Sequence, residues 1–150
     1  KLVKENIRTY TLDGDNVRKG INKDLSFSPE DRSENNRRIG EIANLFVDAG
    51  MIVLAAFVAP FQKDRNSIKE GVGKENYVEV FVNTSLEECE RRDVKGLYKK
   101  ARAGEIKNFT GLDAPFEEPK HPNLIIKTAG QAIEASAKEV MEYISPKIEY

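Results

Sequence analysis

Apolar stretches with strand-like and helix-like spacing alternate along the chain, and this alternation predicts an α/β fold with a mostly parallel sheet. Residues 51–58 form a continuous apolar run, which is typical of a strand buried on both faces. Residues 7–12, 77–83 and 124–128 are the other expected strands. Helical segments separate these strands, so we expect helices on both faces of the sheet.

Apolar residues at helical spacing predict the helices. The longest should begin at Pro29, where proline suits the first turn, and should stop at Gly50. Shorter helices are expected over residues 62–70 and from a Ser85 cap to about residue 92, and a final helix over residues 131–144. The side chains expected to face inward from the first and last of these helices are Ile39, Ile42, Ala43, Phe46, Ala49, Ile133, Ala137, Val140, Met141 and Ile144.

Composition narrows the class of protein. With 150 residues, 39% hydrophobic and 33% charged, the chain is expected to be one soluble globular domain. No apolar run approaches the roughly 18 residues of a membrane span, and a net charge of −1 argues against general nucleic-acid binding. The single cysteine, Cys89, excludes an internal disulfide and a zinc cluster of cysteines. Residues 1–10 lack the apolar part of a signal peptide, so we expect a cytoplasmic location.

Basic residues concentrate in residues 91–107. Seven basic and two acidic side chains give this stretch a charge of +5 in a chain whose total is −1, so the remainder carries −6. Lys95, Lys99 and Arg102 recur at i, i+4 and i+7, which predicts three cations on one helical face. Phe109 follows on a loop that contains glycine and threonine. A cationic helix leading into an aromatic loop suits a flexible cover over a phosphate-rich ligand, and a solvated basic helix is the simpler alternative.

The tetrapeptide Asp13-Gly-Asp-Asn16 directly follows an expected strand. In open α/β sheets, ligands gather at the carboxyl ends of strands, so two carboxylates there could hold magnesium or accept a hydroxyl proton. The alternative is a turn in which Asp15 caps a short helix that carries Val17 and Arg18.

Residues 27–38 combine an aromatic residue with three arginines. Arginine side chains suit sulfate and phosphate oxygens, and the ring of Phe27 can stack on adenine. Alternatively, Arg32, Arg37 and Arg38 alternate with acidic residues simply because they form the wet face of an amphipathic helix.

These motifs resemble the adenylylsulfate kinases (APS kinases), the P-loop enzymes that phosphorylate the 3′-hydroxyl of adenosine 5′-phosphosulfate (APS). The resemblance runs from about residue 9 to residue 127 and rests on Leu12-Asp-Gly-Asp-Asn-Val-Arg18, on residues 27–38 and on residues 92–113. It implies a P-loop NTPase-like parallel sheet, and a reaction in which ATP and APS give ADP and 3′-phosphoadenosine 5′-phosphosulfate with Mg2+. It further implies a homodimer and allows a fused sulfurylase domain.

The resemblance also implies site residues. A catalytic or magnesium-linked aspartate is expected at Asp13 or Asp15, with the metal at Asp13. The expected APS contacts are Asp15, Arg18, Phe27, Arg32, Asn35, Val58, Ala59, Lys95, Asn108 and Phe109, with the two phenylalanine rings sandwiching adenine. Lys99 and Arg102 are expected at the ATP phosphates, on a lid of about residues 93–118. Many relatives have a serine that can carry a phosphate where this chain has Ala59, so that modification is excluded here.

One motif of the family is absent from the 150 residues, because no Gly-x-x-x-x-Gly-Lys-[Ser/Thr] occurs. In the family, a first strand, the P-loop and a helix precede the segment that begins here near Lys1, and that strand lies in the middle of the sheet. We therefore expect a gap between strands 51–58 and 77–83, a longer parent chain, and no kinase activity from these residues alone. The alternatives are a domain that lost ATP binding and binds a sulfonucleotide as a regulator, and a P-loop kinase for another small hydroxyl compound.

Overall fold

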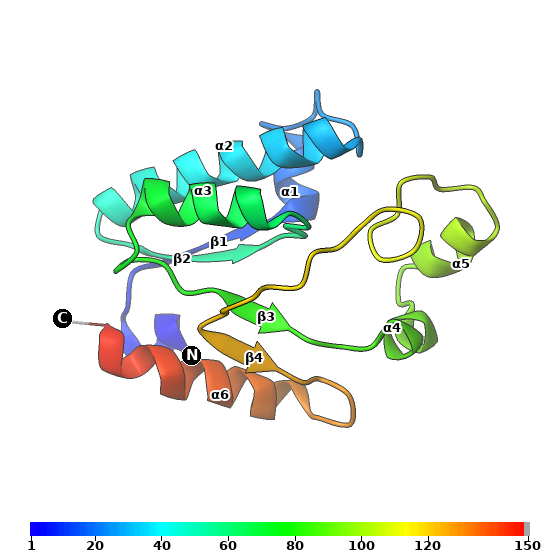
Figure 1. Ribbon diagram of the computed structural model, residues 1–150. Helices are drawn as coiled ribbons and strands as arrows, with labels where there is room; N and C mark the ends of the chain where they lie inside the picture. The colour runs from blue at the N-terminus through cyan, green and yellow to red at the C-terminus, as the bar shows by residue number, and fades with distance from the viewer. Residues whose placement is uncertain (149–150) are drawn as a thin grey trace. The chain divides into compact units, whose positions relative to one another are not determined.

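The strands of the computed structural model, which describes residues 1–148, form two parallel pairs (Figure 1). β1 (Thr9–Asp13) pairs with β2 (Ile52–Ala56), and β3 (Val80–Val82) pairs with β4 (Leu124–Ile126). Each pair lies in its own unit of the chain. Unit 1 is Lys1–Tyr77 with Phe116–Glu118, and unit 2 is Val78–Pro115 with the chain from Pro119 onward. The predicted parallel α/β class is confirmed.

Unit 1 packs its helices on the β1–β2 pair. α1 (Gly14–Lys19) follows β1, α2 (Pro29–Asp48) leads to β2, and α3 (Gln62–Val72) follows β2. Figure 1 shows α2 and α3 side by side along the two strands. A short 3-10 helix, Leu2–Glu5, precedes β1. The buried cluster that joins β1, α1 and α2 consists of Leu12, Val17, Ile39 and Ala43, with Ile42, Phe46, Val53 and Phe57 packed against it.

The ends of α2 follow from local chemistry. Ser28 Oγ accepts the Asp31 N–H at 3.2 Å, and Pro29 begins the helix without a backbone donor to satisfy. Glu30 and Asp31 place negative charge in the first turn, where the helix dipole is positive. Beyond the other end, Gly50 adopts a φ of 73°, which glycine reaches without the cost of a Cβ clash. The predicted start and stop of this helix are confirmed.

Unit 2 contains α4 (Leu86–Arg92), α5 (Leu97–Arg102), α6 (Ile133–Ile144) and a 3-10 turn over Ser145–Lys147. Ser85 caps α4 as predicted, since its Oγ accepts the Glu88 N–H at 3.3 Å. α6 runs along β4, where Ile126 is buried (Figure 1). Within residues 1–148, no helix combines the length and apolar character needed to cross a membrane.

The prediction that residues 51–58 form a strand buried on both faces is wrong. In β2 the segment from Leu54 to Ala56 is exposed, and Leu54 retains 41% of its accessible surface. Among the described residues β2 pairs with β1 alone. An apolar run shows which side chains gain by burial, but it does not show whether a neighbour covers them.

Three apolar residues predicted to face inward are exposed: Ala49, Ile133 and Ala137. Ala49 is the C-terminal cap of α2 and no longer shares the buried stripe of that helix. Ile133 begins α6 and is 83% exposed, whereas Val140, Met141 and Ile144 further along the same helix are half-buried. Helical spacing identifies a stripe, but the partner element covers only part of its length.

The prediction that Lys95, Lys99 and Arg102 share one helical face is also wrong. Gly96 adopts a φ of 66° and forms the N-terminal cap, so that α5 begins at Leu97 and leaves Lys95 outside the helix. A left-handed glycine interrupts the helix at the point where the charge spacing alone predicted a continuous one.

Candidate functional site

Strand-end carboxylates lie at one edge of unit 1. Asp13 ends β1 and caps α1, since its Oδ1 accepts the Asp15 N–H at 2.9 Å. The sequence alternative assigned this cap to Asp15, and the structure assigns it to Asp13. In the parallel register Asp13 lies beside Ala56, so the carboxyl end of β2 leads directly into Val58 and Ala59. The carboxyl ends of β1 and β2 therefore lie side by side at this edge.

The residues at this edge fit a magnesium ion held mainly by a nucleotide. Within residues 1–148, no group of three or more histidine, cysteine, aspartate or glutamate side chains is placed to hold a metal. Mg2+ in phosphate-transfer sites usually takes only one or two carboxylates and completes its shell with phosphate oxygens and waters. The cap occupies Oδ1 of Asp13 and leaves Oδ2 for such a role.

Two guanidinium groups lie close to the ring of Phe27. The Cζ atom of Arg18 is 4.3 Å and that of Arg32 is 5.4 Å from the centroid of its ring. Arg18 Nη1 donates to the carbonyls of Leu25 at 3.2 Å and Ser26 at 2.9 Å, and Arg32 Nε donates to the Phe27 carbonyl at 3.1 Å. The ring is 55% exposed. Burial lowers the pKa of Arg18 from its usual value, and nearby Asp31 opposes that shift. The arrangement offers two cations and an aromatic face to a ligand.

Asn35 lies deeper than a surface contact residue. It is only 4% exposed, and its Oδ1 accepts a hydrogen bond from Asn22 Nδ2 at 3.0 Å. This buried amide pair ties the segment after α1 to α2. The hydrophobic pattern gave no signal for either asparagine, because both are polar residues inside a core.

The neighbouring arginines follow the wet-face interpretation. Arg37 pairs with Glu34 at 2.7 Å, and Arg38 pairs with both Glu34 and Asp24 at 2.8 Å. The hydrogen bonds from Arg37 and then Arg38 lower the pKa of Glu34 to about 2. Arg37 and Arg38 thus form ion pairs with acidic residues on or beside α2.

A cluster of hydrogen bonds, which we call the Arg65–Glu117 clasp, holds the loop that contains Ala59. Arg65 on α3 is 5% exposed and donates from Nη1 to the Ala59 carbonyl at 2.6 Å and from Nη2 to the Glu117 carbonyl at 2.7 Å. The Glu117 N–H donates to the Pro60 carbonyl at 2.8 Å, and its Oε2 accepts the Gln62 N–H at 2.6 Å. The clasp could not be predicted from the sequence, because the position of Arg65 is that of an ordinary polar residue of an amphipathic helix.

The cationic segment of unit 2 is organised by acidic partners. Asp93 accepts the N–H groups of Tyr98 and Lys99, both at 3.0 Å, and these bonds, that of Lys99 first, lower its pKa. Arg102 Nε pairs with Glu90 at 2.7 Å, and the side chains of Lys95 and Lys99 are exposed. Arg102 and Lys99 are the two predicted ATP contacts. To reach ATP, Arg102 would have to break its ion pair with Glu90, in which Lys99 takes no part.

Asn108 and Phe109 lie on a tight turn in unit 2. The ring of Phe109 meets the ring of Tyr98 edge-on, with centroids 4.9 Å apart and planes at 65°. Burial, and secondly a hydrogen bond with Cys89, raises the pKa of Tyr98 to about 12. Cys89 on α4 is half-buried. His121 is exposed.

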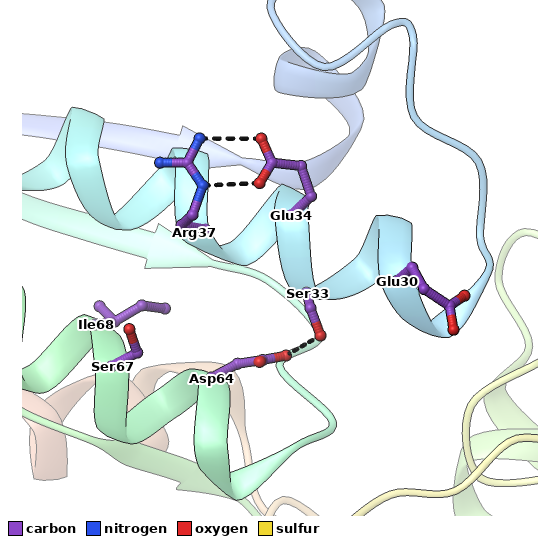
Figure 2. A pocket seen from close by; sticks show the side chains of 7 residues that line it. All are labelled: Glu30, Ser33, Glu34, Arg37, Asp64, Ser67 and Ile68. Atoms are coloured by element: carbon purple, nitrogen blue, oxygen red, sulfur yellow. Dashed lines mark hydrogen bonds and ion pairs between the residues drawn. The ribbon is translucent and has the colours of Figure 1, made fainter.

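A pocket of about 310 Å³ between α2 and α3 contains none of the predicted site residues (Figure 2). Its lining consists of Glu30, Ser33, Glu34, Arg37, Asp64, Ser67 and Ile68. Ser33 Oγ donates to Asp64 Oδ2 at 2.8 Å, and Arg37 is paired with Glu34. With three carboxylates and one arginine, the pocket does not suit a phosphate or sulfate.

Known proteins similar to this chain are adenylylsulfate kinases. The family model described as adenylylsulphate kinase matches residues 1–127. An adenylyl-sulfate kinase of Oceanobacillus iheyensis is 56% identical over 139 residues, which cover 93% of this chain and 70% of that protein. An adenylyl-sulfate kinase of Acaryochloris marina is 52% identical over 146 residues, which cover 97% and 71%. The solved structure of the Mycobacterium tuberculosis APS kinase CysC in complex with AMPPNP and APS matches with a TM-score of 0.89 and 44% identity, over 96% of this chain and 84% of that one.

Proposed function

Because the chain belongs to the adenylylsulfate kinase family, we propose that it acts in the transfer of the γ-phosphoryl group of ATP to the 3′-hydroxyl of APS. The products are ADP and 3′-phosphoadenosine 5′-phosphosulfate. The similarity to the mycobacterial kinase bound to AMPPNP and APS carries this proposal, since it names both an ATP analogue and the acceptor. The relatives are named as kinases, which favours catalysis over a purely regulatory sulfonucleotide-binding role, and APS over another hydroxyl substrate.

Phosphoryl transfer depends mainly on positioning and on neutralising charge. In our proposal a carboxylate oxygen of Asp13 or Asp15 accepts the proton that leaves the 3′-hydroxyl. Arg18 and Arg32 serve the phosphosulfate oxygens, and the exposed face of Phe27 stacks on adenine. Mg2+, when bound, neutralises charge on the ATP phosphates, and Asp13 is the residue that would hold it. Asn35 stabilises this region through its hydrogen bond with Asn22.

The lid in this proposal covers about residues 93–118, of which residues 93–115 belong to unit 2. Lys95, Asn108 and Phe109 serve APS, and Lys99 and Arg102 serve the ATP phosphates. The clasp keeps Glu117, near the end of this segment, on unit 1. A cytoplasmic location, a homodimer and a fused sulfurylase domain stay predictions.

Arg32→Ala should weaken APS binding by about 1.5–3 kcal/mol, roughly ten- to a hundredfold, because it removes a charge-assisted contact to an anion. Binding of ADP should change little. Isothermal titration calorimetry of the wild-type protein and the variant with each nucleotide measures both effects. Arg37→Ala is the matched control, since Arg37 lies on the same helix but is paired with Glu34. Absence of APS binding by the wild-type protein would refute the proposed function, and equal losses for both nucleotides would refute the role of Arg32.

Backbone amides of residues 93–115 should exchange with solvent faster than those of β2 without nucleotide, and should slow when ADP and APS are added. The cations there repel one another until polyanionic ligands supply the opposite charge. Hydrogen–deuterium exchange with mass spectrometry measures this difference, and peptides from α2 serve as the internal control. Ligand-free exchange in this segment as slow as in β2 would contradict the lid.

A further inference from the structure

The backbone on both sides of Phe27 is fixed to the first turn of α2 by one carboxylate. Asp31 Oδ2 accepts the Ser26 N–H at 2.7 Å and the Ser26 hydroxyl at 2.5 Å. The Ser28 N–H donates to Ser26 Oγ at 3.2 Å, and Ser28 Oγ accepts the Asp31 N–H at 3.2 Å. Ser26, Ser28 and Asp31 thus form a closed set of hydrogen bonds around Phe27. The bonds to the Ser26 hydroxyl and then its backbone lower the pKa of Asp31, so the carboxylate is charged at neutral pH.

A second aspartate does the same for Phe109 in unit 2. Asp113 Oδ2 accepts the Asn108 N–H at 2.8 Å, and its Oδ1 accepts the Phe109 N–H at 2.5 Å. Asn108 adopts a φ of 56°, in the left-handed region, and the N–H groups of Leu112, Asp113 and Ala114 all donate to the Phe109 carbonyl at 3.0–3.2 Å. The carboxylate and the turn together hold the residue on which the ring is mounted.

The two arrangements share one geometry. In each, an aspartate five residues downstream accepts the backbone N–H of the residue before the phenylalanine. A carboxylate that accepts two donors makes charge-assisted bonds, which are shorter and stronger than neutral ones. Each ring also has a second constraint, from the Arg18 and Arg32 guanidinium groups at Phe27 and from the Tyr98 ring at Phe109. Neither aspartate is among the residues that the sequence indicated as ligand contacts.

We propose that Asp31 and Asp113 are positioning residues for APS, each of which sets the backbone that carries one aromatic ring. The inference rests on the proposed function, because it takes the adenine of APS as the planar group on which the rings stack. A ring fixed before binding loses less conformational freedom when it stacks on a base, so removing its carboxylate should weaken binding although the carboxylate does not touch the nucleotide.

Double-mutant cycles test the proposal directly, because a residue that acts through a ring loses its effect when the ring is absent. Asp31→Ala should weaken APS binding about tenfold in the wild-type background and by less than about twofold in a Phe27→Ala background. Asp113→Ala should behave in the same way with Phe109→Ala. Asp31→Asn and Asp113→Asn keep one side-chain oxygen as an acceptor, so they should restore part of the lost affinity. Titration calorimetry with APS measures every variant.

The control variants each remove one negative charge near one of the two aspartates. Glu30→Ala changes a residue in the same helical turn as Asp31, and Glu105→Ala changes a residue in the same segment as Asp113. Both glutamates are exposed. Both controls should leave APS affinity within about twofold of the wild-type value. If either alanine variant of the aspartates fails to fold, its asparagine variant completes the cycle.

The possible results distinguish the positioning role of Asp31 and Asp113 from the proposed function. Non-additive losses with each phenylalanine, together with partial rescue by asparagine, support the proposal. Additive losses, no loss, or losses equal to those of the glutamate controls overturn it while APS binding by the wild-type protein upholds the proposed function. A wild-type protein that does not bind APS overturns both.

Discussion

Without added segments, the polypeptide of residues 1–150 is expected to transfer no phosphate from ATP to APS. Its sequence contains no Gly-x-x-x-x-Gly-Lys-[Ser/Thr], the motif whose backbone N–H groups and lysine surround the phosphates of ATP. The lid cations offer charge but no such cradle. Release of ADP in a coupled assay, and transfer of radiolabelled phosphate to APS, should both remain at background.

Joining an APS kinase strand, P-loop and helix ahead of Lys1 should restore turnover. The matched control is the same fusion with the P-loop lysine changed to alanine, which should stay close to background because the β- and γ-phosphates lose their principal side-chain cation. Measurable turnover by the 150-residue polypeptide would contradict the prediction, because it would require a phosphate cradle other than the P-loop motif.

Asp13→Asn and Asp15→Asn, made in this active fusion, should lower kcat by about 10²–10⁴-fold at whichever position accepts the proton of the 3′-hydroxyl. The KM for APS should change much less, since the group acts in the transition state. Asparagine is a suitable change at Asp13, because it caps helices about as well as aspartate and so retains the bond to the Asp15 N–H. Steady-state kinetics with APS and ATP varied separately measure both constants.

Asp48→Asn is the control for this pair. Asp48 is exposed at the end of α2, where the same change removes a charge ahead of the amino end of β2 and not at the carboxyl ends of the strands. Its kcat should equal that of the unmodified fusion. Wild-type kcat in both test variants would show that the carboxylates at the end of β1 only form a turn.

The sequence predicted the elements of the fold because their ends are set locally. Ser28 and Pro29 begin α2, Ser85 caps α4, and Gly50 follows α2 in a conformation that favours glycine. Each of these signals depends on residues within one turn of the chain. The exposure of Leu54 depends instead on which strands lie beside β2, and that is a property of the whole sheet.

The candidate site divides in the same way. The sequence predicted Arg18, Phe27 and Arg32 as contacts of the same ligand, and the structure places both guanidinium groups within 5.4 Å of the Phe27 ring centroid, which the sequence did not predict. The bonds from Arg65 to Ala59 and Glu117 were not predicted, because they join residues up to 52 positions apart and leave no periodic pattern. The position of Lys95 was predicted wrongly for a local reason. The spacing of the charged residues does not show that Gly96 adopts a left-handed backbone conformation.

The clasp at Glu117 and the pairing of β3 with β4 also bear on the connectivity of the chain. Glu117 is held to Pro60 and Arg65, and Leu124–Ile126 is held to Val80–Val82, by bonds between segments on opposite sides of residues 103–107. The covalent link through those residues is therefore not what keeps the flanking segments together. This turn, with Gly104 at a φ of 77°, is a place where the chain could be opened to create new termini, or where foreign residues could be inserted, with little loss of the structure on either side.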